Sequence, residues 1–214
     1  MKIAVIGAAG KAGSLIAKEA LGRGHEVTAI VRPGSEDRVP AGCAILAKSL
    51  FDLTAADLRD FAAVVNAFGT PYDVPGKEQE HIDAAKLLIA IGGELPEVRF
   101  LTIGGYGSLY TDETKTKQVV DGIPKDVGAV PWAAKEALDL FRQADMNWTF
   151  FSPAGFFDPK GARTGSYTLG GDVVILNAQG KSYISYADFA VAMVDEIEAG
   201  KHIRERITAV SCEA

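Results

Sequence analysis

Short apolar runs and apolar residues at helical spacing alternate along the first part of the chain. Residues 3–6 are a branched apolar run with the length of a buried strand, and an apolar pattern at helical spacing begins after Gly13. The glycines at 22 and 24 suit the left-handed turn that ends a helix, and residues 27–31 form a second apolar run. Strand, helix and strand within about thirty residues indicate a βαβ unit with parallel strands.

The same alternation continues to about residue 151. Apolar runs predict further strands at 44–47, 62–68, 98–103, 148–151 and 206–210. Helical spacing predicts helices at 54–61, 78–91, 132–144 and 189–197. This order is typical of an α/β protein with a Rossmann-type, doubly wound parallel sheet.

A different pattern begins near residue 155. Residues 166–169 and 173–176 flank a glycine turn and predict a hairpin, and residues 183–184 continue the extended structure. Ser185 and Asp188 then resemble a capping box at a helix start. Because residues 155–187 are too few for a core of their own, we expect one domain over 1–214, with this excursion as a small cap on the substrate side.

Three glycines follow the first strand with the spacing G-x-x-G-x-x-G. Gly7 would turn the chain off the strand, Gly10 would let backbone N–H groups approach a pyrophosphate, and Gly13 would let the helix pack on the sheet. Strand context and the following strand agree with this interpretation. The loop therefore predicts a dinucleotide site.

The end of the second strand indicates which dinucleotide binds. An NAD site places an acid there, but this chain has Arg32, and Glu26 lies at the opposite end of the strand. Arg32 and Lys11 would both suit a ribose 2′-phosphate, although both would also be ordinary as solvated surface cations. We predict NADP(H) in preference to NAD(H).

Composition narrows the class of protein. The chain has 214 residues, 48% of them hydrophobic and 23% charged, with a net charge of −6. This acidity argues against a nucleic-acid or anionic-membrane partner. Cys43 and Cys212 lack the spacing of a metal site or a disulfide framework, and no apolar stretch is long enough to span a membrane. We expect a cytoplasmic monomer or homodimer that acts on a small molecule.

Other positions at predicted strand ends are candidates for contacts with the cofactor. Asp52 and Leu53 would flank the adenine, or Asp52 would cap the helix at Thr54, and both can hold together. Small and apolar residues at 66–69 would let that loop lie along the cofactor. Residues 109–130 form a long polar stretch, which is typical of a functional lid or a mobile segment.

Several blocks resemble a known family. They are residues 2–13, 24–32, 104–109, 147–154, 163–167 and 182–190. With them the chain resembles the atypical short-chain dehydrogenases/reductases, and within that group the bacterial NAD(P)H-flavin reductases, which are related to biliverdin reductase B and to NmrA-like proteins. The resemblance implies a Rossmann-type fold with NADP(H) across the carboxyl ends of the strands. It also implies hydride transfer to a flavin such as FMN or riboflavin, bound as a substrate and not as a tightly held cofactor.

The resemblance also implies two sets of contact residues. Those expected at the phosphates are Gly7, Ala9, Gly10, Lys11, Ala12, Gly13 and Arg32. Those expected along the ribose and nicotinamide are Ala67, Phe68, Gly69, Ile103, Gly104, Gly105, Pro153 and Ala154.

One departure from typical short-chain dehydrogenases bears on the chemistry. They use Tyr-x-x-x-Lys, but four residues before Lys135 stands Pro131, so no tyrosine is placed to protonate an alkoxide. Flavin reduction suits this absence, because it depends mainly on positioning two planar rings. Ser108 would be a hydroxyl near the acceptor or simply a turn residue, and Tyr106 would stack on the acceptor. Lys135 would touch the nicotinamide ribose or face water.

Two functions from different classes follow. The first is an NADPH-dependent reductase of a flavin or of a similar flat acceptor such as a quinone. The alternative is a non-catalytic, NADP(H)-sensing module that binds a partner protein, as NmrA-like proteins do. His81 is expected to be one polar position on its helix, with catalysis as the less favoured alternative.

Overall fold

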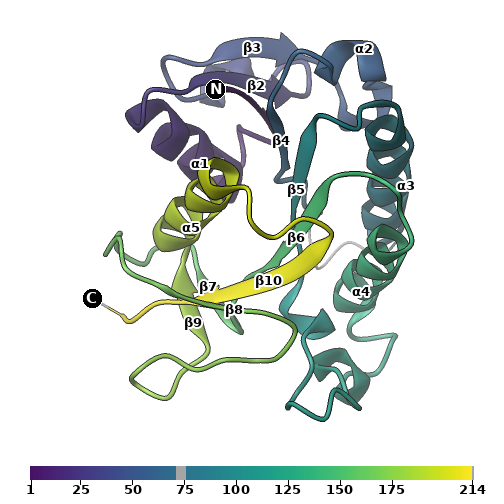
Figure 1. The fold of residues 1–214 in the computed structure, drawn as a ribbon, viewed down its shortest axis with the longest axis vertical. Helices are drawn as coiled ribbons and strands as arrows, with labels where there is room; N and C mark the ends of the chain where they lie inside the picture. Colours follow the sequence, from purple (N-terminus) through teal and green to yellow (C-terminus); the bar gives the residue numbers. More distant parts are fainter. Residues whose placement is uncertain (71–75, 214) are drawn as a thin grey trace.

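The computed structural model describes residues 1–70 and 76–213. Within these ranges, eight strands form one sheet in the order β3-β2-β1-β4-β5-β6-β10-β8 (Figure 1). Its strands are β1 (Lys2–Ile6), β2 (Glu26–Val31), β3 (Ala44–Ala47), β4 (Ala63–Asn66), β5 (Arg99–Ile103), β6 (Trp148–Ser152), β8 (Thr168–Gly170) and β10 (Glu205–Val210). All neighbours are parallel except β8 and β10, so the predicted Rossmann-type, mostly parallel sheet is confirmed.

Helices cover both faces of this sheet (Figure 1). Helices α1 (Lys11–Gly22) and α5 (Tyr186–Ala199) lie on one face, and α3 (Gln79–Glu94) and α4 (Ala129–Arg142) lie on the other. The short α2 (Ala55–Leu58) covers less than the predicted 54–61. None of the helices in the described ranges is long and apolar enough to cross a membrane.

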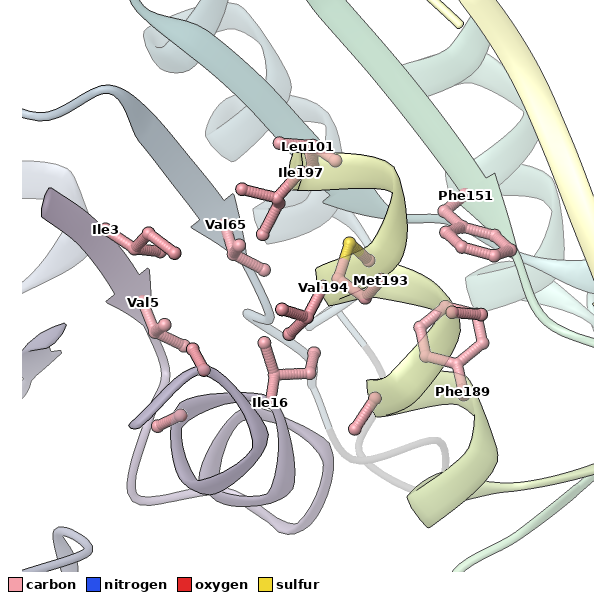
Figure 2. Close-up of a cluster of buried hydrophobic side chains, with 14 of the residues drawn as sticks. Ile3, Val5, Ile16, Val65, Leu101, Phe151, Phe189, Met193, Val194 and Ile197 are labelled. Carbon is pink, nitrogen blue, oxygen red and sulfur yellow. The ribbon is translucent and has the colours of Figure 1, made fainter. Parts of the chain in front are cut away.

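The strands are apolar on both sides because both sides are covered. Along β1, Ile3 and Val5 point into the layer under α1 and α5, whereas Ala4 and Ile6 point into the layer under α3 and α4. Figure 2 shows the first layer, in which Phe151 of β6 meets Phe189 of α5 at 4.6 Å between ring centroids. This packing holds α5 against the sheet.

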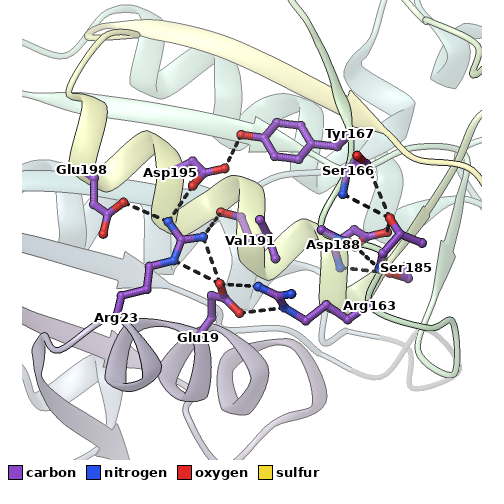
Figure 3. A network of polar contacts seen from close by, with 12 residues as sticks. Glu19, Arg23, Arg163, Ser166, Tyr167, Ser185, Asp188, Val191, Asp195 and Glu198 are labelled. Carbon is purple, nitrogen blue, oxygen red and sulfur yellow. Dashed lines mark hydrogen bonds and ion pairs between the residues drawn. The ribbon is translucent and has the colours of Figure 1, made fainter.

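A polar network ties the outer faces of α1 and α5 together (Figure 3). The Arg23 guanidinium donates to Glu19 at 2.9 Å, to Asp195 at 2.5 Å and to Glu198 at 2.9 Å. Burial opposes a charged Arg23, but these hydrogen bonds outweigh it and raise the pKa of the guanidinium. Glu19 also accepts from Arg163 at 3.1 and 2.9 Å, so the network reaches the excursion after β6.

The excursion differs from the predicted hairpin. Antiparallel pairing is present, but β8 pairs with β10, and of residues 173–176 only Val173 forms a bridge in the described chain, to Tyr110. Two further strands, β7 (Phe156–Asp158) and β9 (Tyr183–Ser185), form a separate parallel pair. A local glycine turn therefore predicted the wrong partner, since β8 instead pairs with the free edge of β10.

Asp188 anchors this excursion at the start of α5. The Ser185 hydroxyl oxygen accepts from the Asp188 N–H at 2.9 Å, which confirms half of the predicted capping box. The Asp188 carboxylate does not complete the box. It accepts instead from the N–H groups of Thr164 and Gly165, both at 2.8 Å, and from the Thr164 hydroxyl at 2.8 Å.

The long polar stretch at 109–130 has hydrogen bonds of its own. Thr111 N–H donates to the Lys117 carbonyl and Val119 N–H to that of Leu109, both at 2.9 Å, and a short 3₁₀ turn, η4, covers Val119–Gly122. Helix α4 then begins at Ala129, three residues earlier than predicted. Pro131 stands in its first turn, where its missing N–H removes no intrahelical bond.

Candidate functional site

The glycine loop after β1 is built by close backbone contacts. Gly7 has φ +78°, which favours glycine, and a Cβ there would lie 2.8 Å from the Ala67 carbonyl oxygen. A Cβ on Gly13 would overlap the Gly7 carbonyl and lie 3.1 Å from the Ala8 Cα. The loop, β4 and the start of α1 can approach one another this closely only without these side chains.

The start of α1 is open to an anion. The helix begins at Lys11, its N-cap is Gly10 without a side-chain cap, and no acidic residue stands in its first turn. The first N–H groups of a helix have no intrahelical partner and carry partial positive charge. The glycine loop therefore fits a pyrophosphate at this position.

A cleft of about 530 Å³ runs from this loop over the carboxyl ends of β1, β2 and β4. Its lining includes Gly7, Ala9, Gly10, Arg32, Ser35, Arg38, Lys48, Ser49, Leu50, Phe51, Ala67, Phe68, Gly69, Thr70, Lys77 and Glu80. Of the expected phosphate contacts, Gly7, Ala9, Gly10 and Arg32 are thus brought together. Lys11 and Ala12 follow directly at the start of α1, and Lys11 is exposed.

The far end of the cleft is rich in cations. Arg32 is exposed at the end of β2, and the Arg38 guanidinium donates to the Ser35 hydroxyl at 2.7 Å. Lys48 forms an ion pair with Asp57 at 2.7 Å. Among the described lining residues, Glu80 is the sole carboxylate, and it pairs with Lys77. This end therefore suits an anionic group more than a neutral ribose.

The residues that follow β3 differ from those predicted to flank the adenine. Ser49, Leu50 and Phe51 line the cleft, whereas Asp52 ends the 3₁₀ turn η2 (Leu50–Asp52) outside the lining and Leu53 is packed in the core, 3% exposed. The 3₁₀ turn rotates the chain, so that the contact falls two or three residues earlier than expected.

Asp52 does not cap the next helix either. Thr54 is the N-cap of α2, and its N–H and hydroxyl donate to Asp57 at 2.8 and 2.7 Å. The capping role of Asp52 is therefore wrong, whereas its contact with the adenine stays a prediction.

The loop after β4 lies along the cleft as predicted. Ala67, Phe68 and Gly69 line it, and the Phe68 N–H donates to the Asn66 side-chain oxygen at 3.1 Å. Thr70 lines it as well and was not predicted.

The residues expected at the nicotinamide stand at the carboxyl ends of β5 and β6, outside the lining of this cleft. Ile103 ends β5, and a Cβ on the following Gly104 would collide with the Phe150 ring; on Gly105 it would lie 2.9 Å from the Ala134 side chain. Pro153 and Ala154 are buried just after β6. These glycines bring the backbone close to α4 and β6.

Each of the three expected catalytic residues has a hydrogen-bond partner, an ion-pair partner or a packing neighbour within the chain. Ser108 is 0% exposed and its hydroxyl donates to the Gly105 carbonyl at 2.9 Å, which agrees with the alternative that it is a turn residue. The Lys135 ammonium lies 2.6 Å from Asp139, one helical turn away. Tyr106 is half-buried, and its ring faces Gly155, where a Cβ would lie 3.0 Å from it.

Several lining residues were missed by reasoning from sequence, namely Ser35, Lys48, Ser49, Thr70 and Lys77. A signal was present for two of them. Lys48 and Ser49 directly follow the predicted strand 44–47, at the sheet edge where ligands of α/β proteins bind.

Comparison with known proteins agrees with this geometry. Residues 7–199 match the family described as NAD(P)H-binding. Uncharacterized protein YwnB of Bacillus subtilis is 51% identical over 216 residues, which cover 99% of each chain.

Solved structures are similar over the whole length. SP1627 from Streptococcus pneumoniae, whose printed name is "putative NADH-flavin reductase", is 44% identical with a TM-score of 0.91, over 99% of this chain and 100% of that one. A short-chain dehydrogenase/reductase from Veillonella parvula is 16% identical with a TM-score of 0.71, over 98% and 94%, and shares the fold. The chain belongs to the NAD(P)H-binding family.

Proposed function

We propose that the protein is an NADPH-dependent reductase that transfers a hydride to a flavin, such as FMN or riboflavin, or to a similar flat acceptor such as a quinone. The observation that carries the nucleotide assignment is the cationic end of the cleft. Arg32 and Arg38 stand where an NAD site would place an acid. A guanidinium can bind a 2′-phosphate with two parallel hydrogen bonds.

The residues that line the cleft suit the adenine, the pyrophosphate and the riboses of the nucleotide. The glycine loop and the start of α1 would hold the pyrophosphate, Phe51 and Leu50 would border the adenine, and Ala67–Gly69 would lie along the riboses. When bound, the reduced nicotinamide supplies the hydride. The chain itself would mainly position the two reactants, since its best hydroxyl candidate, Ser108, is buried in a turn.

The acceptor class is supported by what stands around Lys135. Pro131 occupies the place of the tyrosine that protonates an alkoxide, and Lys135 is paired with Asp139. A ketone would need that proton donor, whereas a flavin can take its proton from water. The name of the S. pneumoniae protein also supports a flavin as the acceptor, but it gives NADH as the donor.

The nucleotide preference is tested by titration of NADPH and NADH with wild type and Arg32→Ala. Losing a charge-assisted contact of about 1.5–3 kcal/mol should weaken NADPH binding about 10- to 100-fold and leave NADH unchanged. Arg59→Ala, an exposed arginine outside the cleft lining, is the matched control and should bind both as wild type does. Tighter binding of NADH than of NADPH by the wild type would refute the assignment.

The reaction is tested by following oxidation of NADPH with FMN, riboflavin or a quinone. Turnover with one of them supports the reductase. Tight NADPH binding without turnover on any acceptor would favour the second candidate, an NADP(H)-sensing module that binds a partner protein. The internal hydrogen bond of Ser108 and the ion pair of Lys135 favour that candidate, because both groups are occupied and neither is assigned as the proton donor of a reaction.

A further inference from the structure

A second, much smaller cavity lies directly behind the cleft. It measures about 20 Å³ and is enclosed by α3, α4 and the carboxyl ends of β4 and β5. Its polar lining consists of Asn66, His81 and Thr102, and the Thr102 hydroxyl is buried without a partner among the described residues. Apolar side chains form the rest of the wall, namely Phe68, Ala84, Ala85, Ile103, Ala134, Ala137, Phe141 and Phe150.

Two residues connect this cavity to the cleft. Thr70 lines the cleft, and its hydroxyl oxygen lies 2.8 Å from Nε2 of His81, which lines the cavity. Phe68 lines both, and its ring meets Phe51 on the cleft side at 5.8 Å and His81 on the cavity side at 5.9 Å. His81 thus supports the cofactor-facing loop 67–70 from behind, by one hydrogen bond and one ring contact.

We propose that neutral His81 is the positioning residue of this loop, holding Thr70 and Phe68 against the nucleotide, so that the cleft binds NADPH less tightly once His81 is protonated. The proposal rests on the proposed function of the cleft as the nucleotide site. A neutral imidazole with its proton on Nδ1 accepts from the Thr70 hydroxyl at Nε2. An imidazolium would have to donate to the Thr70 oxygen instead, and it would place a positive charge against the apolar wall of the cavity.

The surroundings of His81 disfavour its charged form. Burial lowers the pKa of His81, and Glu80 in the same helix opposes this effect. Glu80 is itself paired with Lys77. The described residues that face His81 from β4, β5, β6 and α4 carry no charge. The cavity has room for about one water molecule, so an imidazolium would be poorly hydrated on that side.

The sign of the effect follows from linkage. With the loop in place the pKa of His81 is lowered, and with the loop displaced the imidazole reaches water and its pKa returns toward about 6.5. The conformation in which loop 67–70 contacts His81 is therefore fully populated above about pH 6.5, and its population decreases as the pH falls below that value. The affinity for the nucleotide should decrease together with this population.

The experiment is a set of NADPH titrations between pH 5.5 and 7.5 with wild type and His81→Gln. Glutamine can take up the Thr70 hydrogen bond without gaining a charge. The ratio of the two dissociation constants at each pH cancels the ionisation of the nucleotide's own phosphates. We expect the two proteins to agree within about twofold at pH 7.5, and the wild type to lose about fivefold more affinity on acidification.

Two further variants separate positioning from folding. Thr70→Val removes the hydroxyl but keeps the shape, and should weaken NADPH binding about three- to tenfold at pH 7.5 without lowering the unfolding temperature. His25→Gln is the matched control, because His25 pairs with Glu198 on another surface, and it should keep the pH profile of the wild type.

Parallel pH profiles for wild type and His81→Gln, or wild-type affinity in Thr70→Val, would overturn the proposal and leave the proposed function standing. Absence of NADPH binding by the wild type at every pH would overturn both.

Discussion

Gly13→Ala should weaken nucleotide binding without unfolding the protein. Besides overlapping the Gly7 carbonyl oxygen, the new Cβ would lie 2.9 Å from the Gly7 carbonyl carbon, whereas ordinary contacts begin at 3.4 Å. Backbone atoms cannot rotate away as a flexible side chain can, so α1 and the loop must separate by at least half an ångström. Overpacking of this kind costs about 1–3 kcal/mol of stability.

The larger effect should be on the phosphate contacts. The N–H groups at the start of α1 and the turn at Gly7 must both face the same pyrophosphate, and losing one hydrogen bond to a charged group costs about 1.5–3 kcal/mol. We therefore expect the dissociation constant for NADPH to rise about tenfold or more.

The assay is calorimetric titration with NADPH, together with urea unfolding. Gly22→Ala is the matched control, because Gly22 lies in the same helix, its Cβ would meet nothing within 4 Å, and its backbone is not left-handed. That change should keep NADPH binding and stabilise the protein by about 0.5–1 kcal/mol. Wild-type affinity in Gly13→Ala would refute the close-approach reasoning and the position of the site with it.

Three further changes test the framework by urea unfolding. Glu19→Gln removes the negative charge that pairs with Arg163. Because the hydrogen bond from Arg163 lowers the pKa of Glu19 from 4.5, the stability lost relative to wild type should be full above pH 4.5 and shrink below it, and an equal loss at about pH 3.5 and pH 7 would contradict the ion pair. Arg99→Met removes the guanidinium that pairs with the carboxylate of Glu196, which is 3% exposed, and should lower the free energy of unfolding by about 3–5 kcal/mol. An unchanged free energy of unfolding would mean that the pair contributes no net stability. Phe189→Ala empties a fully buried ring site under α5 and should cost about 3–5 kcal/mol, whereas a loss below 1 kcal/mol would indicate that the layer collapses around it.

The parallel core of the fold was predictable because its signals are local. Each strand of the βαβ unit is an uninterrupted apolar run such as residues 3–6, and Gly7 and Gly13 mark the turn and the close approach between them. The order of elements then restricts the topology. The partner of β8 was not predictable in this way, since its ladder with β10 joins segments about forty residues apart and competes with a nearby glycine turn.

The residues of the site were predictable where the path of the backbone alone places them at the cleft. Ala67, Phe68 and Gly69 line the cleft because they follow a parallel strand. Ser108 illustrates the opposite case: its hydroxyl looks available in the sequence, and only the 3₁₀ turn η3 (Tyr106–Ser108) reveals that Gly105 accepts its hydrogen bond. Side chains whose role depends on a partner several residues away cannot be assigned from their identity.

The network on the outer face of α1 has a consequence for the order in which the protein matures on the ribosome. Arg23 reaches Asp195 and Glu198, which lie 172 and 175 residues further along the chain. The glycine loop emerges first during synthesis, but the helix that carries it stays uncovered until α5 has left the exit tunnel. We therefore expect the nascent chain to become able to bind its nucleotide only after α5 has emerged and docked against α1.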